Sequence, residues 1–381
     1  MLVLKFKDAF SSLFAATLGF TAYAFTLSEG NLGYFALSQV AVVGVFLLAL
    51  LMDRNPQGIP KKNVLVWALF VTMLLSNIAI NFNNYSNADF GLLAARVAGL
   101  SILIFILQWS VIAFNPVRIM VILGFTLTPL VCYATMVSLG NLGVERSAPL
   151  GIHPNWWGEL LFCYSACALV MPNRVIKWSM LGVVLLLFYL VQSRGAFVAS
   201  TVTGGIYFAS TVRFKPQNTR RYIFVGIVLV LAVIALLWWF GLMQIVDFIS
   251  NDVFLLNNEY RGVDSDFVGR TEGWRLAWDT FLANPIFGKG FDTMTDVHNG
   301  FLRLMAEGGM IMLVSVLWLS WAGIITARRT GNHIGFAVII GYFVMVLFAP
   351  RFLNMNLAST IFFMSIFPWR MVDKLNKQTL I

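Results

Sequence analysis

Residues 119–139 read IMVILGFTLTPLVCYATMVSL and contain no charged side chain. A helix needs about 20 consecutive apolar residues to cross the hydrocarbon core of a bilayer, and this run meets that length. The rest of the chain has the same character, since 59% of its 381 residues are hydrophobic and only 11% are charged. Soluble globular domains carry roughly 25% charged residues. The composition therefore excludes a soluble globule and predicts a membrane protein.

Similar apolar runs recur on both sides of residues 119–139 and predict an all-α polytopic membrane protein with about twelve transmembrane helices. The first run is longer than the 7–15 apolar residues of a signal peptide, so we predict a retained helix. We expect one transmembrane domain over residues 1–381. The predicted spans are residues 10–27, 33–52, 63–81, 92–114, 119–139, 157–171, 178–192, 197–212, 223–243, 308–327, 334–351 and 355–370.

The loops between these runs alternate in charge. If the N-terminus is cytoplasmic, the inside segments hold 17 of the 26 basic residues and only three of the 17 acidic residues. Cytoplasmic loops of membrane proteins carry such an excess of Lys and Arg, so we predict that both termini are cytoplasmic. The net charge of +9 resides mainly in these short loops, which indicates contact with the lipid bilayer and not with nucleic acid. The inside basic residues are Lys5, Lys7, Arg54, Lys61, Lys62, Arg118, Arg174, Lys177, Arg213, Lys215, Arg220, Arg221, Arg328, Arg329, Arg370, Lys374 and Lys377.

The longest loop, residues 244–307, lies on the predicted outer side between the ninth and tenth spans. We treat it as an insertion that carries part of the functional site. Part of it has the helical spacing of an amphipathic helix, with Thr271 as the predicted N-cap and Pro285 as the predicted stop. The apolar stripe of this helix comprises Trp274, Ala277, Trp278, Phe281 and Leu282.

Three outer clusters contain the residue types of an anion site with a base. Arg194 lies in the short turn 193–196 between two apolar runs, where a charged side chain at membrane depth is a functional candidate. Arg270 opens the amphipathic helix, and free N–H groups at a helix start attract anions. His298 lies near the next helix start, and His is the usual general base at neutral pH. Arg275 and Asn299 are neighbouring candidates for substrate binding.

Other polar residues have two possible roles, substrate binding or a structural contact. Arg96 lies inside the fourth span and either lines the same cavity or pairs with an acid such as Glu159. Glu159, at the start of the sixth span, and His153, in the loop before it, are further substrate-binding candidates. His153 and His298 could equally be structural hydrogen-bonding residues.

Two further pairs have simple structural interpretations. Arg303 and Glu307 are four residues apart and predict a salt bridge on one helix face. Cys163 and Cys167 also share a helix face and predict plain packing, because two thiols make a poor metal site. Asp292 and Asp296 lack further ligands nearby, so we predict no metal site and no cofactor.

The order and spacing of the outer motifs resemble the O-antigen ligase and O-antigen polymerase superfamily of bacterial membrane glycosyltransferases. The motif resemblance covers about residues 190–310, and the predicted topology fits over the whole chain. The matching motifs are Ser193-Arg194-Gly195-Ala196, Arg270 with Trp274 and Trp278 leading to Pro285 and Gly288-Lys289-Gly290, and His298-Asn299-Gly300-Phe301-Leu302 with Glu307-Gly308.

The resemblance implies a multi-pass protein of the bacterial inner membrane that transfers a glycan on the periplasmic face. The donor would be a glycan on undecaprenyl pyrophosphate. The acceptor would be lipid A core for a ligase in lipopolysaccharide synthesis, or a growing glycan for a polysaccharide polymerase. Arg194 and Arg270 would bind the pyrophosphate, and His298 would activate the acceptor hydroxyl. The reaction would be inverting and metal-independent.

A membrane transporter or lipid-linked glycan flippase is the main alternative. Transporters usually place polar groups near the membrane midplane on broken helices. Here only Arg96 lies deep, and the other polar residues gather on one side with a structured loop. This distribution favours an enzyme at the outer face over a transporter.

Overall fold

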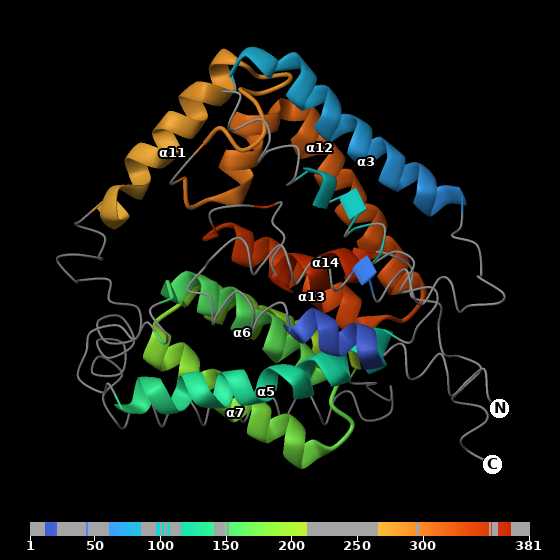
Figure 1. The fold of residues 1–381 in the computed structure, drawn as a ribbon, viewed down its shortest axis with the longest axis vertical. Coiled ribbons are helices and arrows are strands. Elements are labelled where there is room, and N and C mark those ends of the chain that lie inside the picture. The colour runs from blue at the N-terminus through green and yellow to red at the C-terminus, as the bar shows by residue number, and fades with distance from the viewer. Residues whose placement is uncertain are drawn as a thin grey trace, which may run out of the picture.

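The computed structural model describes a helical protein, and no strand occurs among the described residues (Figure 1). Those are residues 12–20, 43–44, 61–84, 97–99, 101–102, 104, 106, 116–140, 149, 152–211, 266–294, 297–349, 352 and 357–366. The helices are α3 (Lys61–Ile80), α5 (Pro116–Gly140), α6 (Pro154–Leu169), α7 (Arg174–Val191), α8 (Arg194–Thr211), α11 (Asp266–Ala283), α12 (Gly300–Arg329), α13 (His333–Val346) and α14 (Leu357–Ile366), with a short 3₁₀ helix at Phe82–Asn84.

The observed helices coincide with eight of the predicted spans. By length and composition, three of them are long and apolar enough to cross a membrane: α5, α7 and α12. These match the runs 119–139, 178–192 and 308–327. The other matches are α3, α6, α8, α13 and α14. The predicted runs 33–52 and 223–243 and both chain termini fall largely or wholly outside the described residues, so twelve spans with cytoplasmic termini remain a prediction.

Helices α6, α7 and α8 form an antiparallel series because short turns join them. Asn173 caps α7 through bonds from the backbone N–H groups of Val175 (2.8 Å) and Ile176 (3.3 Å). Gln192 ends α7 in the left-handed conformation (φ 55°), and Arg194 is the first residue of α8. The starts of α6 and α8 therefore lie at one end of the bundle. A side chain at Gly158 of α6 would collide with Ser193, which confirms this closeness.

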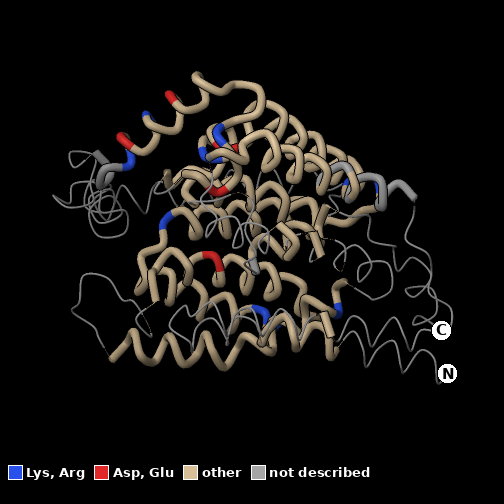
Figure 2. The backbone as a smooth tube through the Cα atoms, turned by 45° about the horizontal axis from the view of Figure 1, so that its top comes forward, with Lys and Arg blue, Asp and Glu red and all other residues tan. Residues whose placement is uncertain are grey.

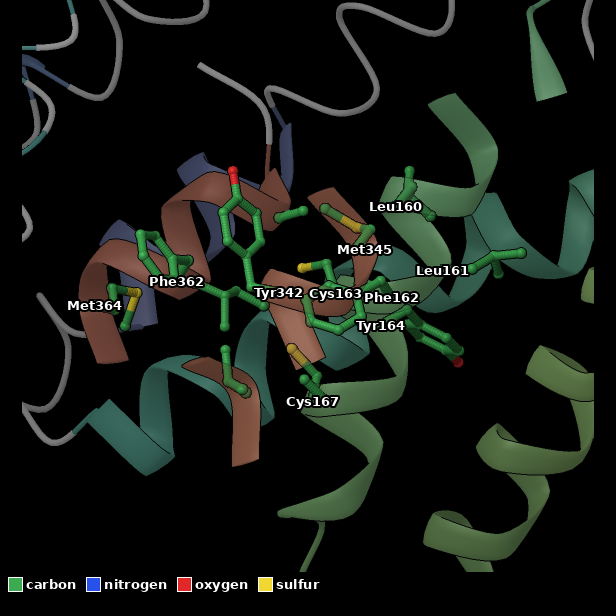
Figure 3. Packing of buried hydrophobic residues seen from close by; sticks show 14 of the residues in the cluster. Leu160, Leu161, Phe162, Cys163, Tyr164, Cys167, Tyr342, Met345, Phe362 and Met364 are labelled. Atoms are coloured by element: carbon green, nitrogen blue, oxygen red, sulfur yellow. The ribbon is translucent and has the colours of Figure 1, made fainter. Parts of the chain in front are cut away.

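The core is packed through small residues where helices cross closely. Gly341 of α13 faces Thr203 of α8, and a Cβ there would overlap the Thr203 hydroxyl. Small residues at helix interfaces let backbones approach in membrane proteins. Around this crossing lie stacked aromatic rings, with Tyr342 and Phe362 at 4.3 Å (Figure 3). Cys163 and Cys167 are fully buried in this core, which confirms the packing interpretation of the two thiols.

Helix α13 runs antiparallel to α8, because Gly195 at the start of α8 lies against Phe348 just beyond the end of α13. Phe301 at the start of α12 packs edge-on to Phe343 (5.6 Å) and Phe352 (5.3 Å). The starts of α6, α8 and α12 and the end of α13 thus share one end of the bundle, which we call the site end. The opposite end, where α7 and α13 begin, we call the basic end.

The two ends differ in charge among the described residues. All described Asp and Glu belong to α11, to the segment after it, and to the first three turns of α6 and α12 (Figure 2). At the basic end, the helix ends that flank the α6–α7 and α12–α13 turns carry no Asp or Glu among the described residues. Their Lys, Arg and His side chains are Arg174, Lys177, Arg328, Arg329 and His333. The prediction that the basic end faces the cytoplasm rests on this asymmetry.

Helix α12 is interrupted at Gly309, which adopts φ 65° and ψ −164°. The interruption lets the turn after α11 dock against α12: Met310 N donates to Pro285 O (2.8 Å) and Gly290 N donates to Glu307 O (2.9 Å). A Cβ on Gly309 would overlap the Ile286 carbonyl oxygen. Both the backbone conformation and the lack of room for a Cβ therefore require glycine here.

Gly309→Ala should lower the free energy of unfolding by at least about 1–3 kcal/mol, because this backbone region is nearly restricted to glycine. Thermal unfolding of the purified protein in detergent measures the effect. Gly182→Ala in α7 is the matched control, since nothing lies within 4 Å of its added Cβ and alanine favours a helix. Equal melting temperatures for Gly309→Ala and the wild type would contradict the assigned backbone strain.

Candidate active site

Helix α11 leads toward the site through residues 284–299, which we call the connecting segment; residues 295 and 296 lie outside the described part of the chain. Figure 1 shows the ends of α11 and α3 meeting above the start of α12. The inner side of α11 packs against this region, with Ala277 fully buried beside Met294, Val297 and Ala306. This packing holds the connecting segment between α11 and α12.

The predicted amphipathic helix of the outer loop exists as α11, but its predicted start was wrong. It begins at Asp266 and not after Thr271, because Gly269 weakens a helix by only about 1 kcal/mol and does not end it. Only part of the predicted apolar stripe packs against the protein. Trp274, Ala277 and Phe281 face inward, whereas Trp278 (45% exposed) and Leu282 (57% exposed) lie on the surface. The helix ends at Ala283, before Pro285 as predicted.

A buried ion network ties the connecting segment to α12. Arg303 Nε donates to Glu307 Oε1 at 2.8 Å, which confirms the predicted salt bridge. The same guanidinium donates to Asp292 Oδ1 at 3.0 Å. Glu307 Oε1 also accepts from Met294 N at 3.1 Å. Arg303 (4% exposed) and Glu307 (5% exposed) are buried charges, and burial is tolerated because each is paired.

Asn77 of α3 was not predicted to contribute to the site. Its side chain donates to Phe287 O at 2.6 Å and to Glu307 O at 3.2 Å, and accepts from Phe291 N at 2.8 Å. It is 5% exposed. The only sequence signal was the presence of an amide in the last turn of an apolar run, and that signal does not name a partner more than two hundred residues away.

His298 occupies the last position before the N-cap of α12. Its φ is 46°, a left-handed conformation that is uncommon for residues other than glycine, and its Nδ1 is buried. Asn299 caps the helix, since its Oδ1 accepts from Phe301 N and Leu302 N, both at 3.1 Å. The predicted helix start is therefore correct. Asn299, a predicted substrate-binding residue, thus also has a structural role, because its amide oxygen caps α12.

Arg194 is half-buried as the first residue of α8, at the site end. Arg270 is half-buried in the second turn of α11, so it does not lie at the helix start as predicted. The side chain of Arg275, by contrast, is 84% exposed, and its Nε lies 3.9 Å from Asp279 Oδ2. Of the predicted arginines, Arg194 and Arg270 are thus the partly enclosed ones, and Arg96 lies outside the described residues.

His153 and Glu159 lie at the start of α6, also at the site end. His153 is exposed and caps the helix, with Nδ1 accepting from Asn155 N at 3.2 Å. The bond gives His153 a structural hydrogen-bonding role, one of the two roles that the sequence left open. Glu159 is half-buried in the second turn of α6.

The fold therefore brings Arg194, Glu159, His153 and His298 to one end of the helical bundle. Helix α11 packs against the connecting segment through Trp274 and Ala277, and Arg270 lies nearer the start of that helix. Asp292, one of the two carboxylates weighed as metal ligands, is bound to Arg303. This end, with its arginine and histidine side chains and the buried polar network beside an apolar bundle, is the candidate site of a membrane protein.

Residues 179–317 match the family model described as O-antigen ligase. This match supports the O-antigen ligase superfamily and confirms the resemblance drawn from the motifs. A comparison with curated proteins finds no match. The matched region contains Arg194, Arg270, Arg275, His298 and Asn299, whereas Arg96, His153, Glu159 and Asn77 precede it. The match supports a function of the O-antigen ligase or polymerase type.

Proposed function

We propose that this protein transfers a glycan from undecaprenyl pyrophosphate to an acceptor hydroxyl at the periplasmic face of the bacterial inner membrane. The O-antigen ligase match over residues 179–317 carries the proposal, because it contains both partly enclosed arginines and His298. The acceptor is lipid A core if the protein is a ligase, and a carrier-linked glycan if it is a polymerase.

The proposed chemistry follows from the charge that develops during transfer. As the bond between the sugar and the pyrophosphate breaks, negative charge grows on the leaving oxygen, and fixed guanidiniums stabilise it. Arg194 and Arg270 take this role, since an arginine fork binds two phosphate oxygens at once. His298 removes the proton from the acceptor hydroxyl, which then attacks the anomeric carbon from the opposite side and inverts it.

An in vitro assay tests the proposal. Purified protein receives an undecaprenyl-pyrophosphate-linked glycan together with either lipid A core or a second carrier-linked glycan. Glycan on lipid A core indicates a ligase, and a lengthened carrier-linked glycan indicates a polymerase. Absence of product with both acceptors, combined with flux of the lipid-linked glycan in proteoliposomes, would overturn the proposal in favour of a flippase.

Chelation should leave the transfer rate within about twofold of its untreated value, because guanidiniums take the role that a divalent cation plays in other transferases. The measurement compares initial rates with and without EDTA at constant ionic strength. Phosphate–arginine contacts weaken with salt, so the ionic-strength match is the necessary control. A strong loss that Mg²⁺ restores would contradict the metal-free mechanism.

A further inference from the structure

The buried amide of Asn77 connects three parts of the chain that lie far apart in sequence. Its Nδ2 donates to Phe287 O (2.6 Å) at the start of the connecting segment and to Glu307 O (3.2 Å) on α12. Its Oδ1 accepts from Phe291 N (2.8 Å) in the middle of the segment. One side chain on α3 thus uses both its donor and its acceptor to hold the backbone that leads to His298.

Further contacts hold the connecting segment beyond Phe291. Asp292 is bound to Arg303, and Met294 N donates to Glu307 Oε1. Val297 is fully buried, and the next residue is His298. Asp292 and His298 both hold a left-handed backbone (φ 64° and 46°), which persists in proteins where the surrounding structure imposes it. Contacts at residues 287, 291, 292 and 294 thus hold the described part of the segment between Asn77 and the region of His298.

We infer that Asn77 is a positioning residue for the transfer reaction: it acts through the connecting segment to hold His298 in its reactive place. This inference rests on the proposed function, in which His298 is the base. Asn77 lies on α3, before the region that matches the family model. A displacement of about 1 Å at a reacting group can lower a rate about 10²-fold, so an anchor of this kind has kinetic consequences.

Only an amide satisfies all three contacts. Aspartate has the same shape but no Nδ2 donor, so Asn77→Asp turns a carboxylate oxygen toward the carbonyls of Phe287 and Glu307. Alanine removes all three bonds and leaves the buried Phe291 N–H without this acceptor. Both variants should loosen the segment, the first by repulsion and the second by loss of contacts.

The test combines steady-state kinetics with amide hydrogen exchange on the full-length protein in detergent. For Asn77→Asp and Asn77→Ala we expect kcat to fall about 10- to 100-fold with the donor KM within about threefold, because the anchor orients the base and does not bind the donor. Exchange at the backbone of residues 287–294 should accelerate at least about tenfold in both variants. Asn173→Ala is the matched control: it removes an asparagine side chain that makes two backbone bonds at the basic end, and its kcat should stay within about twofold.

A double variant separates positioning from general stability. If Asn77 acts through His298, adding Asn77→Ala to His298→Asn should lower the residual kcat by less than about threefold, since the base is already absent. A further loss as large as that of Asn77→Ala alone would overturn the inference, as would a wild-type kcat in both Asn77 variants.

Failure of the proposed function gives a different result. If the wild-type protein transfers no glycan to either acceptor, the proposed reaction is refuted. Hydrogen exchange of residues 287–294 would still show whether Asn77 holds the connecting segment. Unchanged exchange of residues 287–294 in both Asn77 variants would overturn the anchor itself, whatever the activity.

Discussion

Arg194→Ala should lower kcat of glycan transfer by about 10²–10³-fold, the loss typical of removing one group that stabilises transition-state charge. Arg194→Lys should be nearly as poor, because an ammonium is a point charge and does not reproduce the two parallel bonds of a guanidinium to phosphate. Arg270→Ala should behave in the same way. Initial rates with purified variants measure the effect, and the melting temperature in detergent reports whether each variant folds.

The chain offers a matched control for this experiment. Arg174 begins α7 as Arg194 begins α8, but it is exposed and lies at the basic end. Arg174→Ala should therefore leave kcat within about twofold. Wild-type activity of Arg194→Lys would contradict bidentate binding of the pyrophosphate, and equal losses at Arg174 and Arg194 would contradict the assignment of the active face.

His298→Asn should lower kcat by about 10²–10⁴-fold, the usual contribution of a general base. Asparagine is preferred to alanine here because it tolerates the left-handed backbone (φ 46°) that His298 adopts, so the variant removes the base with little backbone strain. The acceptor KM should change less than kcat, since the lost interaction belongs to the transition state.

His333→Asn provides the control for His298→Asn. His333 is the first residue of α13 at the basic end, far along the bundle from the proposed chemistry, and its replacement should leave the rate unchanged. Full activity of His298→Asn would assign His298 a structural role, the alternative that the sequence left open.

Contacts within one helix could be predicted from the sequence. Arg303 and Glu307 are four residues apart, a separation that places two side chains on one helix face whatever surrounds it, and the pair forms at 2.8 Å. The wrong prediction of Thr271 as an N-cap has a local cause too, because capping residues also occur inside helices and only the preceding backbone shows where a helix begins.

The apolar stripe of α11 shows where local information ends. Periodicity places Trp274, Ala277, Trp278, Phe281 and Leu282 on one broad face, but how much of that face is covered depends on the partner. The partner is a narrow contact with the connecting segment and α12, so Trp278 and Leu282 stay exposed. No property of the stripe itself contains this information.

The sequence by itself determined that this is a helical membrane protein, where most of its helical runs lie, and which family its motifs resemble. It could do so because apolar length, periodicity and short motifs are local properties. The tertiary structure alone decided the kink at Gly309, the third partner of the Arg303 pair and the three contacts of Asn77. Those features join residues that are 11 to 230 positions apart in the sequence. Local sequence patterns do not specify such pairings, because the pairs form only when the helices pack together.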